Sequence, residues 1–466
     1  NSVAETASND NANISLESET GFEQRFQRIA VGESFNAATV FGSGVSNVKV
    51  INSNIASASG TTITAKAFGR TQVVGTVNGE MSIIELEVRT SSSDVAAPMV
   101  AAGGGHTVAL KKDGTVWTWG NNGVGQLGDG TSVTKAYPVQ VFAGEENDSS
   151  TGYLNNIIQI SAGSNYVMAL KKDGTVFTWG SNAYGQLGNG SSVNSILPVQ
   201  VKSADGNSFL TDIVQISAGY VHSMALKKDG TVLAWGRNDG GQLGNNNTSN
   251  KSLPVQVKGG ASGSEYLTDV VQVTAGNWHS MALKANGTVY AWGWGQYGQL
   301  GNGYTTNSYD SDQYIGEKIY SAPVQVLNGA QTSETGYLKE VVQIDAMGGT
   351  GHDDRNRFGT SLAVTESKEV YGWGNSLYGA LGVKSSIVSK PVRVGTDISN
   401  AVQVAGGGKS GSDDWHVNSI GNTGYTYILK EDGTVSSLGY NANGELGNGA
   451  QTSTTAVQEV SNLTEI

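Results

Sequence analysis

The chain has 466 residues, of which 65 are glycine and none is cysteine, and its formal net charge is −12 at pH 7. The lack of cysteine excludes a disulfide framework and thiolate chemistry. The acidic balance argues against a nucleic-acid partner, because phosphate binding needs a surplus of Lys and Arg on one face. No apolar run is long enough to cross a membrane. The glycine content suits a chain made of many tight turns.

The N-terminal part is predicted to be a small β-sandwich behind a tail. Residues 1–13 are small and polar, which is typical of a disordered tail. Residues 14–90 show short alternating β runs separated by turn residues such as Gly60 and Asn78-Gly79, and this pattern predicts about seven strands. The order VGES, then residues 50–80, resembles the bacterial immunoglobulin-like domains of surface proteins. Residues 91–97 are predicted to be a linker.

One sequence unit then occurs six times in residues 98–466. Its first copy is HTVALKKDGTVWTWGNNGVGQLG at 106–128. Later copies repeat its turn and its tryptophan at Asp173-Gly174 with Trp179, Asp229-Gly230 with Trp235, and Asn286-Gly287 with Trp292. A fifth copy has Ser367-Lys368 near the turn and Trp373, and a sixth has Asp432-Gly433 and Leu438.

Each unit is predicted to form a four-stranded sheet. Asp-Gly between two apolar runs indicates a hairpin with a tight primed turn, in which both central residues have positive φ. Another β run ending in Ala-Gly precedes this hairpin, and Pro-Val-Gln-Val follows it. Four-stranded sheets repeated about an axis leave few exposed edges, so we expect an all-β protein whose main domain is a β-propeller.

The consensus AGxxHSxALKxDGTVxxWGxNxxGQLGxG followed by PVQV resembles the repeat of the regulator of chromosome condensation family. The resemblance covers roughly residues 98–466. The family's type member has seven blades, whereas six copies are present here. Because Leu463–Ile466 resembles Leu210–Ile213, which opens the third copy, we expect a closed ring of six blades with residues 98–103 near residues 463–466. A seventh copy outside this sequence is the competing interpretation.

The histidines are candidates for site chemistry. His106, His222 and His279 share one repeat position, and we expect hydrogen bonds between blades there rather than a metal ring, which would need three or four converging ligands. Two insertions carry aspartate pairs beside a histidine. Calcium could bind these pairs if the two loops approach each other, and solvated loop charge is the alternative. The candidate ligands are Asp353, Asp354, Asp413 and Asp414.

Aromatic residues are predicted to gather on one face of the propeller. The loops after the first and third strands emerge on the same face, and the insertions at 302–322, 347–360 and 406–424 belong to these loops. Clustered exposed aromatics usually mark a binding surface, although several could instead pack against their own insertions. The candidate ligand-binding residues are Tyr184, Tyr220, Trp278, Trp294, Tyr297, Tyr309, Tyr314, Tyr378 and Trp415.

These observations lead to a functional hypothesis. No set of acid, base and nucleophile can be assembled, so we expect a protein that is not an enzyme. We expect a monomeric, secreted or cell-surface protein of bacterial type that binds a protein or carbohydrate partner through the insertion-bearing aromatic face. The alternative is a carbohydrate-active enzyme or lectin on the same face, with the four aspartates as candidate acids. A nucleotide-exchange regulator is a third possibility, implied by the family resemblance.

Overall fold

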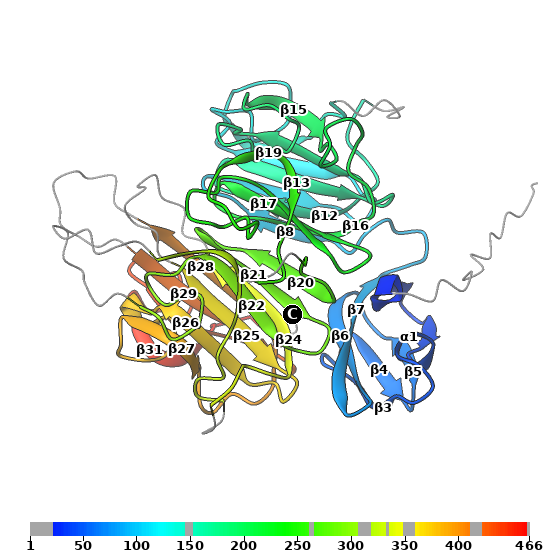
Figure 1. Cartoon of the computed structure of the whole chain (residues 1–466), viewed down its shortest axis with the longest axis vertical. Coiled ribbons are helices and arrows are strands. Elements are labelled where there is room, and N and C mark those ends of the chain that lie inside the picture. The colour runs from blue at the N-terminus through cyan, green and yellow to red at the C-terminus, as the bar shows by residue number, and fades with distance from the viewer. Residues whose placement is uncertain are drawn as a thin grey trace, which may run out of the picture.

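The computed structural model describes residues 22–144, 152–260, 265–305, 318–331, 335–347, 359–410 and 422–463. These residues form two N-terminal sheets followed by six four-stranded sheets (Figure 1). The predicted all-β propeller fold with six repeats is therefore confirmed.

The N-terminal module is a sandwich of seven strands. Its sheets have the orders β1-β7-β6-β3 and β2-β5-β4, and they enclose a core that includes Val73, Ile84 and Leu86. Its assignment as an immunoglobulin-like domain remains a prediction. The elements are η1 (Phe22–Arg25), β1 (Phe26–Ala30), β2 (Ser34–Asn36), α1 (Ala38–Phe41), β3 (Ser46–Val50), β4 (Ala56–Ser59), β5 (Thr62–Ala65), β6 (Gly69–Val77) and β7 (Glu80–Arg89).

Each following sheet is one blade of four consecutive antiparallel strands. Blade 1 contains β8 (Met99–Ala102), β9 (His106–Leu110), β10 (Val116–Gly120) and β11 (Lys135–Gln140). Blade 2 contains β12 (Ile157–Ala162), β13 (Tyr166–Lys171), β14 (Val176–Gly180) and β15 (Ser195–Gln200). Blade 3 contains β16 (Ile213–Ala218), β17 (His222–Lys227), β18 (Val232–Gly236) and β19 (Lys251–Gln256).

The remaining blades follow the same order. Blade 4 contains β20 (Val270–Ala275), β21 (His279–Lys284), β22 (Val289–Trp294) and β23 (Ile319–Gln325). Blade 5 contains β24 (Val341–Met347), β25 (Thr360–Thr365), β26 (Val370–Asn375), η2 (Leu377–Gly379) and β27 (Ile387–Arg393). Blade 6 contains β28 (Ala401–Ser410), β29 (Asn422–Lys430), β30 (Val435–Gly439) and β31 (Thr454–Glu459).

The Asp-Gly hairpins differ from the predicted primed turn. In blade 1 Gly114 has φ of 80°, but Asp113 is not among the residues with positive φ. The Gly114 amide donates to the Lys111 carbonyl (2.9 Å), and the Lys111 amide donates to the Thr115 carbonyl (3.0 Å). This is a tight turn followed by one left-handed residue, as in a three-residue hairpin. Aspartate suits this position because its carboxylate accepts a hydrogen bond from the Thr115 amide (3.0 Å).

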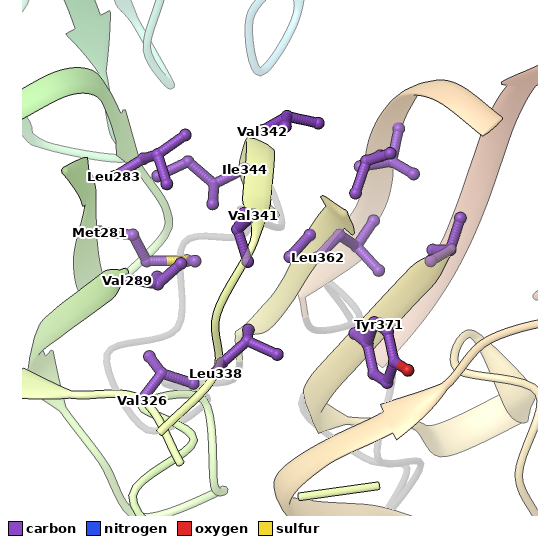
Figure 2. Close-up of a cluster of buried hydrophobic side chains, with 14 of the residues drawn as sticks. Met281, Leu283, Val289, Val326, Leu338, Val341, Val342, Ile344, Leu362 and Tyr371 are labelled. Carbon is purple, nitrogen blue, oxygen red and sulfur yellow. The ribbon is translucent and has the colours of Figure 1, made fainter. Parts of the chain in front are cut away.

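One hydrogen bond between neighbouring blades recurs along the series. A buried tryptophan on the third strand of each of blades 2 to 5 donates its indole N–H to a main-chain carbonyl of the preceding blade. The pairs are Trp179 with Gln126 (3.0 Å), Trp235 with Gln186 (2.9 Å), Trp292 with Gln242 (2.9 Å) and Trp373 with Gln299 (3.0 Å). Apolar side chains fill the space beside these bonds, and Figure 2 shows those from blades 4 and 5.

The sandwich packs against the blades at their Asp-Gly ends. Outward-facing Ile51, Val74 and Ile83 join the same buried cluster as Val341 and Val342 of blade 5. In Figure 1 the blue sandwich accordingly lies beside β20 and β24.

Direct contacts extend this interface to other blades. Arg70 Nη2 donates to the Ile158 carbonyl of blade 2 (3.2 Å), and Lys49 Nζ lies 2.6 Å from Glu366 Oε1 of blade 5. Asn54 Nδ2 donates to the Glu431 carbonyl of blade 6 (2.5 Å). The sandwich therefore covers much of the propeller face that carries the Asp-Gly turns.

The prediction that the first and last blades touch is wrong for the described residues. Gly125 of blade 1 packs so closely on blade 2 that an added Cβ would lie 2.6 Å from Ile196 Cα, whereas the equivalent Gly444 of blade 6 has nothing within 4 Å. On the other side of the opening, Val100 and Tyr137 of blade 1 are 67% and 68% exposed. No hydrogen bond joins blades 1 and 6 within the described ranges. In a closed ring the indole of Trp119 would donate to the Glu445 carbonyl as Trp179 donates to the Gln126 carbonyl, but Trp119 is only half-buried and makes no such bond among the described residues.

Candidate functional site

The face opposite the sandwich carries the three insertions, most of which lie outside the described residues. The same holds for seven predicted site residues, so their binding and metal roles remain predictions: Tyr309, Tyr314, Asp353, Asp354, Asp413, Asp414 and Trp415. Within the described ranges, no three His, Asp or Glu side chains come together as metal ligands. The calcium hypothesis thus remains a prediction about the two insertion loops.

Two predicted site residues are buried rather than exposed. Trp278 is 1% exposed and Trp294 is 3% exposed. Trp278 lies in the loop between β20 and β21, where the guanidinium of Arg237 covers its ring at 4.3 Å and Tyr220 lies 6.5 Å away between ring centroids. The prediction that these tryptophans are free loop aromatics is therefore wrong, because Arg237 of the neighbouring blade covers Trp278 and Trp294 ends strand β22, where it pairs with Ile319.

Arg237 is the centre of a stack that joins three blades. Its guanidinium lies 4.5 Å from the ring of Tyr184 in blade 2 and 4.3 Å from the ring of Trp278 in blade 4. The side chain of Asp239 accepts two hydrogen bonds from it, each 2.9 Å long. Such a desolvated cation between aromatic faces is held by electrostatic attraction to the rings. The stack forms the buried base of this face.

The sequence could have indicated Arg237. The residue after Trp-Gly is Asn121, Ser181 and Asn375 in three copies but Arg237 and Trp294 in the two central copies. This variation at one repeat position was the available signal for a specialised region.

The other predicted aromatics are more accessible. Tyr378 is 43% exposed and packs edge-on against Tyr440, with 5.1 Å between ring centroids. Tyr184, Tyr220 and Tyr297 are half-buried. The structure thus places Tyr184, Tyr220 and Trp278 together around Arg237.

The repeated histidines form the predicted bonds between blades at two of three positions. His222 Nε2 and Ser280 Oγ lie 3.0 Å apart, and His279 Nε2 and Ser361 Oγ lie 2.9 Å apart. Burial lowers the pKa of both histidines to about 3. His106 is buried as well, but both of its ring nitrogens lack a hydrogen-bond partner, and burial lowers its pKa to about 4. The sequence explains the difference, because blade 2 has Val167 where the next copies have serine.

A second series of aromatic residues was missed by the sequence reasoning. One exposed ring stands before the first strand of each of blades 2 to 5, directly ahead of a leucine that is at most 5% exposed. The recurring pair Tyr-Leu or Phe-Leu was the available signal. These rings belong to loops after fourth strands and so lie on the side of the Asp-Gly turns: Tyr153, Phe209, Tyr266 and Tyr337, which are 36% to 50% exposed.

Comparison with known proteins identifies similar repeats. A family model described as "RCC1-like domain" matches residues 64–466. The ultraviolet-B receptor UVR8 of Arabidopsis thaliana is 28% identical over 391 residues, which cover 77% of this chain and 81% of the receptor. The E3 ubiquitin-protein ligase HERC2 of Mus musculus is 35% identical over 303 residues, which cover 64% of this chain but only 5% of the ligase.

Solved structures agree in fold. The structure of human WBSCR16 gives a TM-score of 0.56 at 22% identity and covers 78% of this chain and 81% of that chain. Prp20p from Saccharomyces cerevisiae gives a TM-score of 0.57 at 20% identity, covering 78% of this chain and 77% of that chain.

Two further properties follow from the chain and its relatives. HERC2 and the probable ligase HERC4 are E3 ubiquitin-protein ligases, so repeats of this kind occur within enzymes, and the expectation that the chain is not an enzyme is corrected. The chain spans 5% of the former and 23% of the latter.

None of the helices in the described part is long and apolar enough to cross a membrane.

Proposed function

Because the chain belongs to the RCC1-like domain family, we propose that its propeller binds a protein partner through the face that carries the insertions. The observation that carries this proposal is the position of the sandwich. It occupies the Asp-Gly face, where Lys49, Asn54 and Arg70 contact blades 5, 6 and 2. The opposite face has the Arg237 stack and the bases of all three insertions.

The chemistry of the described residues on this face suits a protein interface. Tyr378 offers an exposed ring beside Tyr440, and tyrosine is enriched at protein interfaces. The side chain of Asp239 is 41% exposed although it holds Arg237. The side chains of the Arg237 stack are already held in place by their contacts, so little conformational entropy is lost when a partner binds over them. Among the relatives, Prp20p is described with binding properties to Gsp1p and histones.

The cellular location forms part of the proposal. The resemblance of the N-terminal sandwich to modules of bacterial surface proteins supports a secreted or surface-attached protein. In that setting a carbohydrate is the competing ligand for the same face, since exposed tyrosines such as Tyr378 suit both partner classes.

Site-specific photo-crosslinking tests the proposal. A photoreactive residue replaces Tyr378 in one variant and Tyr266, on the opposite side, in a matched control. We expect protein adducts from position 378 and few from position 266, identified by mass spectrometry on intact cells and in extracts. Protein adducts from position 266 alone would place the binding surface on the other side. Binding to a glycan array that Tyr378→Ala abolishes, without protein adducts, would favour the carbohydrate partner.

A further inference from the structure

A cavity of about 80 Å³ lies where the sandwich meets the first strands of blades 2 to 4. Its sandwich wall comes from β1, β6 and β7, and its propeller wall comes from β12, β16 and β20. The site is thus built from two modules that are far apart in the sequence and is separate from the insertion-bearing face.

The sandwich wall contains two guanidinium groups, from Arg28 and Arg70, and two carboxyl groups, from Glu85 and Glu87. Arg70 Nη2 lies 2.8 Å from Glu87 Oε2, and Arg28 Nε lies 3.8 Å from the same oxygen. Two guanidinium groups therefore share one carboxylate. Burial lowers the pKa of Arg28, and the nearby Glu87 carboxylate offsets this effect only in part. A guanidinium in such a place favours a further anion.

The second carboxyl group of the cavity, Glu85, does not provide this compensation. Its Oε2 accepts a hydrogen bond from Gln72 Nε2 (3.0 Å), whereas its buried Oε1 has no partner. Burial raises the pKa of Glu85 to about 8, so the group is mostly protonated at pH 7. A protonated carboxyl carries an O–H donor. A buried polar atom without a partner requires an explanation such as a missing ligand or water molecule.

The propeller wall adds an amide donor. Gln159 uses both ends of its side chain to bond blade 3, donating to the Ile216 carbonyl (3.1 Å) and accepting its amide (3.0 Å). The equivalent Gln215 accepts the Val273 amide (2.8 Å), but no hydrogen bond from its own amide group is seen in the described part of the chain. Gln215 lines the cavity.

The rest of the lining consists of the polar Gln27 and of the apolar residues Phe26, Leu86, Val214 and Val271. From this arrangement we propose that the cavity binds a small aliphatic carboxylate, with its carboxylate at Arg28, Gln215 and Glu85 and its short chain against Phe26 and Val271. Two arginines disfavour a cation, and the apolar wall disfavours a fully hydrated inorganic anion. The bound molecule contacts both modules and so strengthens their association.

Thermal unfolding and calorimetric titration of the full chain test the proposal, with sodium butyrate and propionate as probes. A ligand that binds only the native state raises the Tm with concentration. We expect a rise with butyrate at millimolar concentrations and none with sodium chloride or methylammonium chloride at equal ionic strength. Arg28→Gln should weaken butyrate binding at least about tenfold, the effect of losing one charged hydrogen bond. Arg237→Gln, which changes a buried arginine on the other face, should leave butyrate binding unchanged.

A second variant keeps the test valid if Arg28→Gln does not fold. Val214→Phe fills the cavity and leaves every charge in place, so it should also abolish binding. The proposal is overturned if butyrate raises the Tm no more than the salt control does, or if methylammonium binds instead. It is also overturned if either cavity variant folds and binds butyrate like the unmodified chain.

Discussion

The indole N–H of Trp235 in blade 3 donates a 2.9 Å hydrogen bond to the Gln186 carbonyl in blade 2. The ring is completely buried. Trp235→Ala should therefore reduce the free energy of unfolding by about 3–5 kcal/mol, the usual cost of truncating a core tryptophan. Denaturant titration followed by circular dichroism measures this change.

Trp119 is the matched control for that experiment. It occupies the same repeat position in blade 1, but it is only half-buried and has no indole hydrogen bond among the described residues. We expect Trp119→Ala to cost clearly less than Trp235→Ala. Equal losses would mean that a neighbour covers blade 1 as the other blades are covered.

Trp278→Ala should destabilise the protein, although the sequence suggested a dispensable loop residue. Trp278 is 1% exposed, and its ring supports the guanidinium of Arg237. The loss of its packing should lower the Tm by several degrees, whereas Tyr378→Ala should leave the Tm nearly unchanged because that ring is 43% exposed. Differential scanning calorimetry of the two variants separates these outcomes, and an unchanged Tm for Trp278→Ala would contradict the observed burial.

The buried histidines predict loss of stability in acid. The folded pKa of His222 is about 3, below its unfolded value of about 6.5, so the unfolded state binds more protons between these limits. Stability is fully present above pH 6.5 and falls as the pH decreases. Between pH 6.5 and 5 this single histidine should account for about 2 kcal/mol.

His222→Gln tests that contribution. The variant should show a smaller difference in unfolding free energy between pH 7 and pH 5 than the unmodified chain, even if its stability at pH 7 is lower. Parallel denaturant titrations at both pH values provide the comparison. An identical difference in the two proteins would show that the pKa of His222 is the same in the folded and unfolded states.

The interface between sandwich and blades can be opened with one substitution. Ile83 is fully buried in the cluster that contains Val341 and Val342, while the sandwich's own core is formed by other residues. Ile83→Asp should separate the modules, because an unpaired charge in an apolar interface is strongly unfavourable. Small-angle scattering should show a larger radius of gyration, and proteolysis should increase within residues 91–97. Ser46→Asp, at an exposed position, should change neither property.

The blade architecture was predictable because the same strand pattern occurs in every one of the six repeats. Asp113 and Trp179 have equivalents in most copies, so local sequence was enough to locate the hairpins and the tryptophans of the third strands, whereas the indole hydrogen bonds between blades were not predicted. The turn geometry was less accessible, because Asp-Gly is compatible with more than one tight turn and the choice depends on the Lys111 and Thr115 backbone bonds.

The docking of the sandwich and the burial of the tryptophans could not be predicted in this way. Both depend on contacts between residues far apart in the chain, such as Arg70 with Ile158 and Arg237 with Trp278. The lack of contact between blades 1 and 6 in the described residues could not be predicted either, because the last copy keeps the Gly-x-Leu-Gly loop that packs on the next blade in the other copies.

The sandwich has a consequence for the cooperativity of unfolding. A linear series of repeats is stabilised by nearest-neighbour interfaces, so its terminal units fray before its central units. Here one module contacts blade 2 through Arg70, blade 5 through Lys49 and blade 6 through Asn54, and so couples units that are not neighbours. When blade 6 unfolds locally, its hydrogen bonds to the sandwich break as well, and the free-energy cost of this local unfolding is therefore higher. We therefore expect the blades to melt together as a single unit, although no hydrogen bond joins blades 1 and 6 in the described residues.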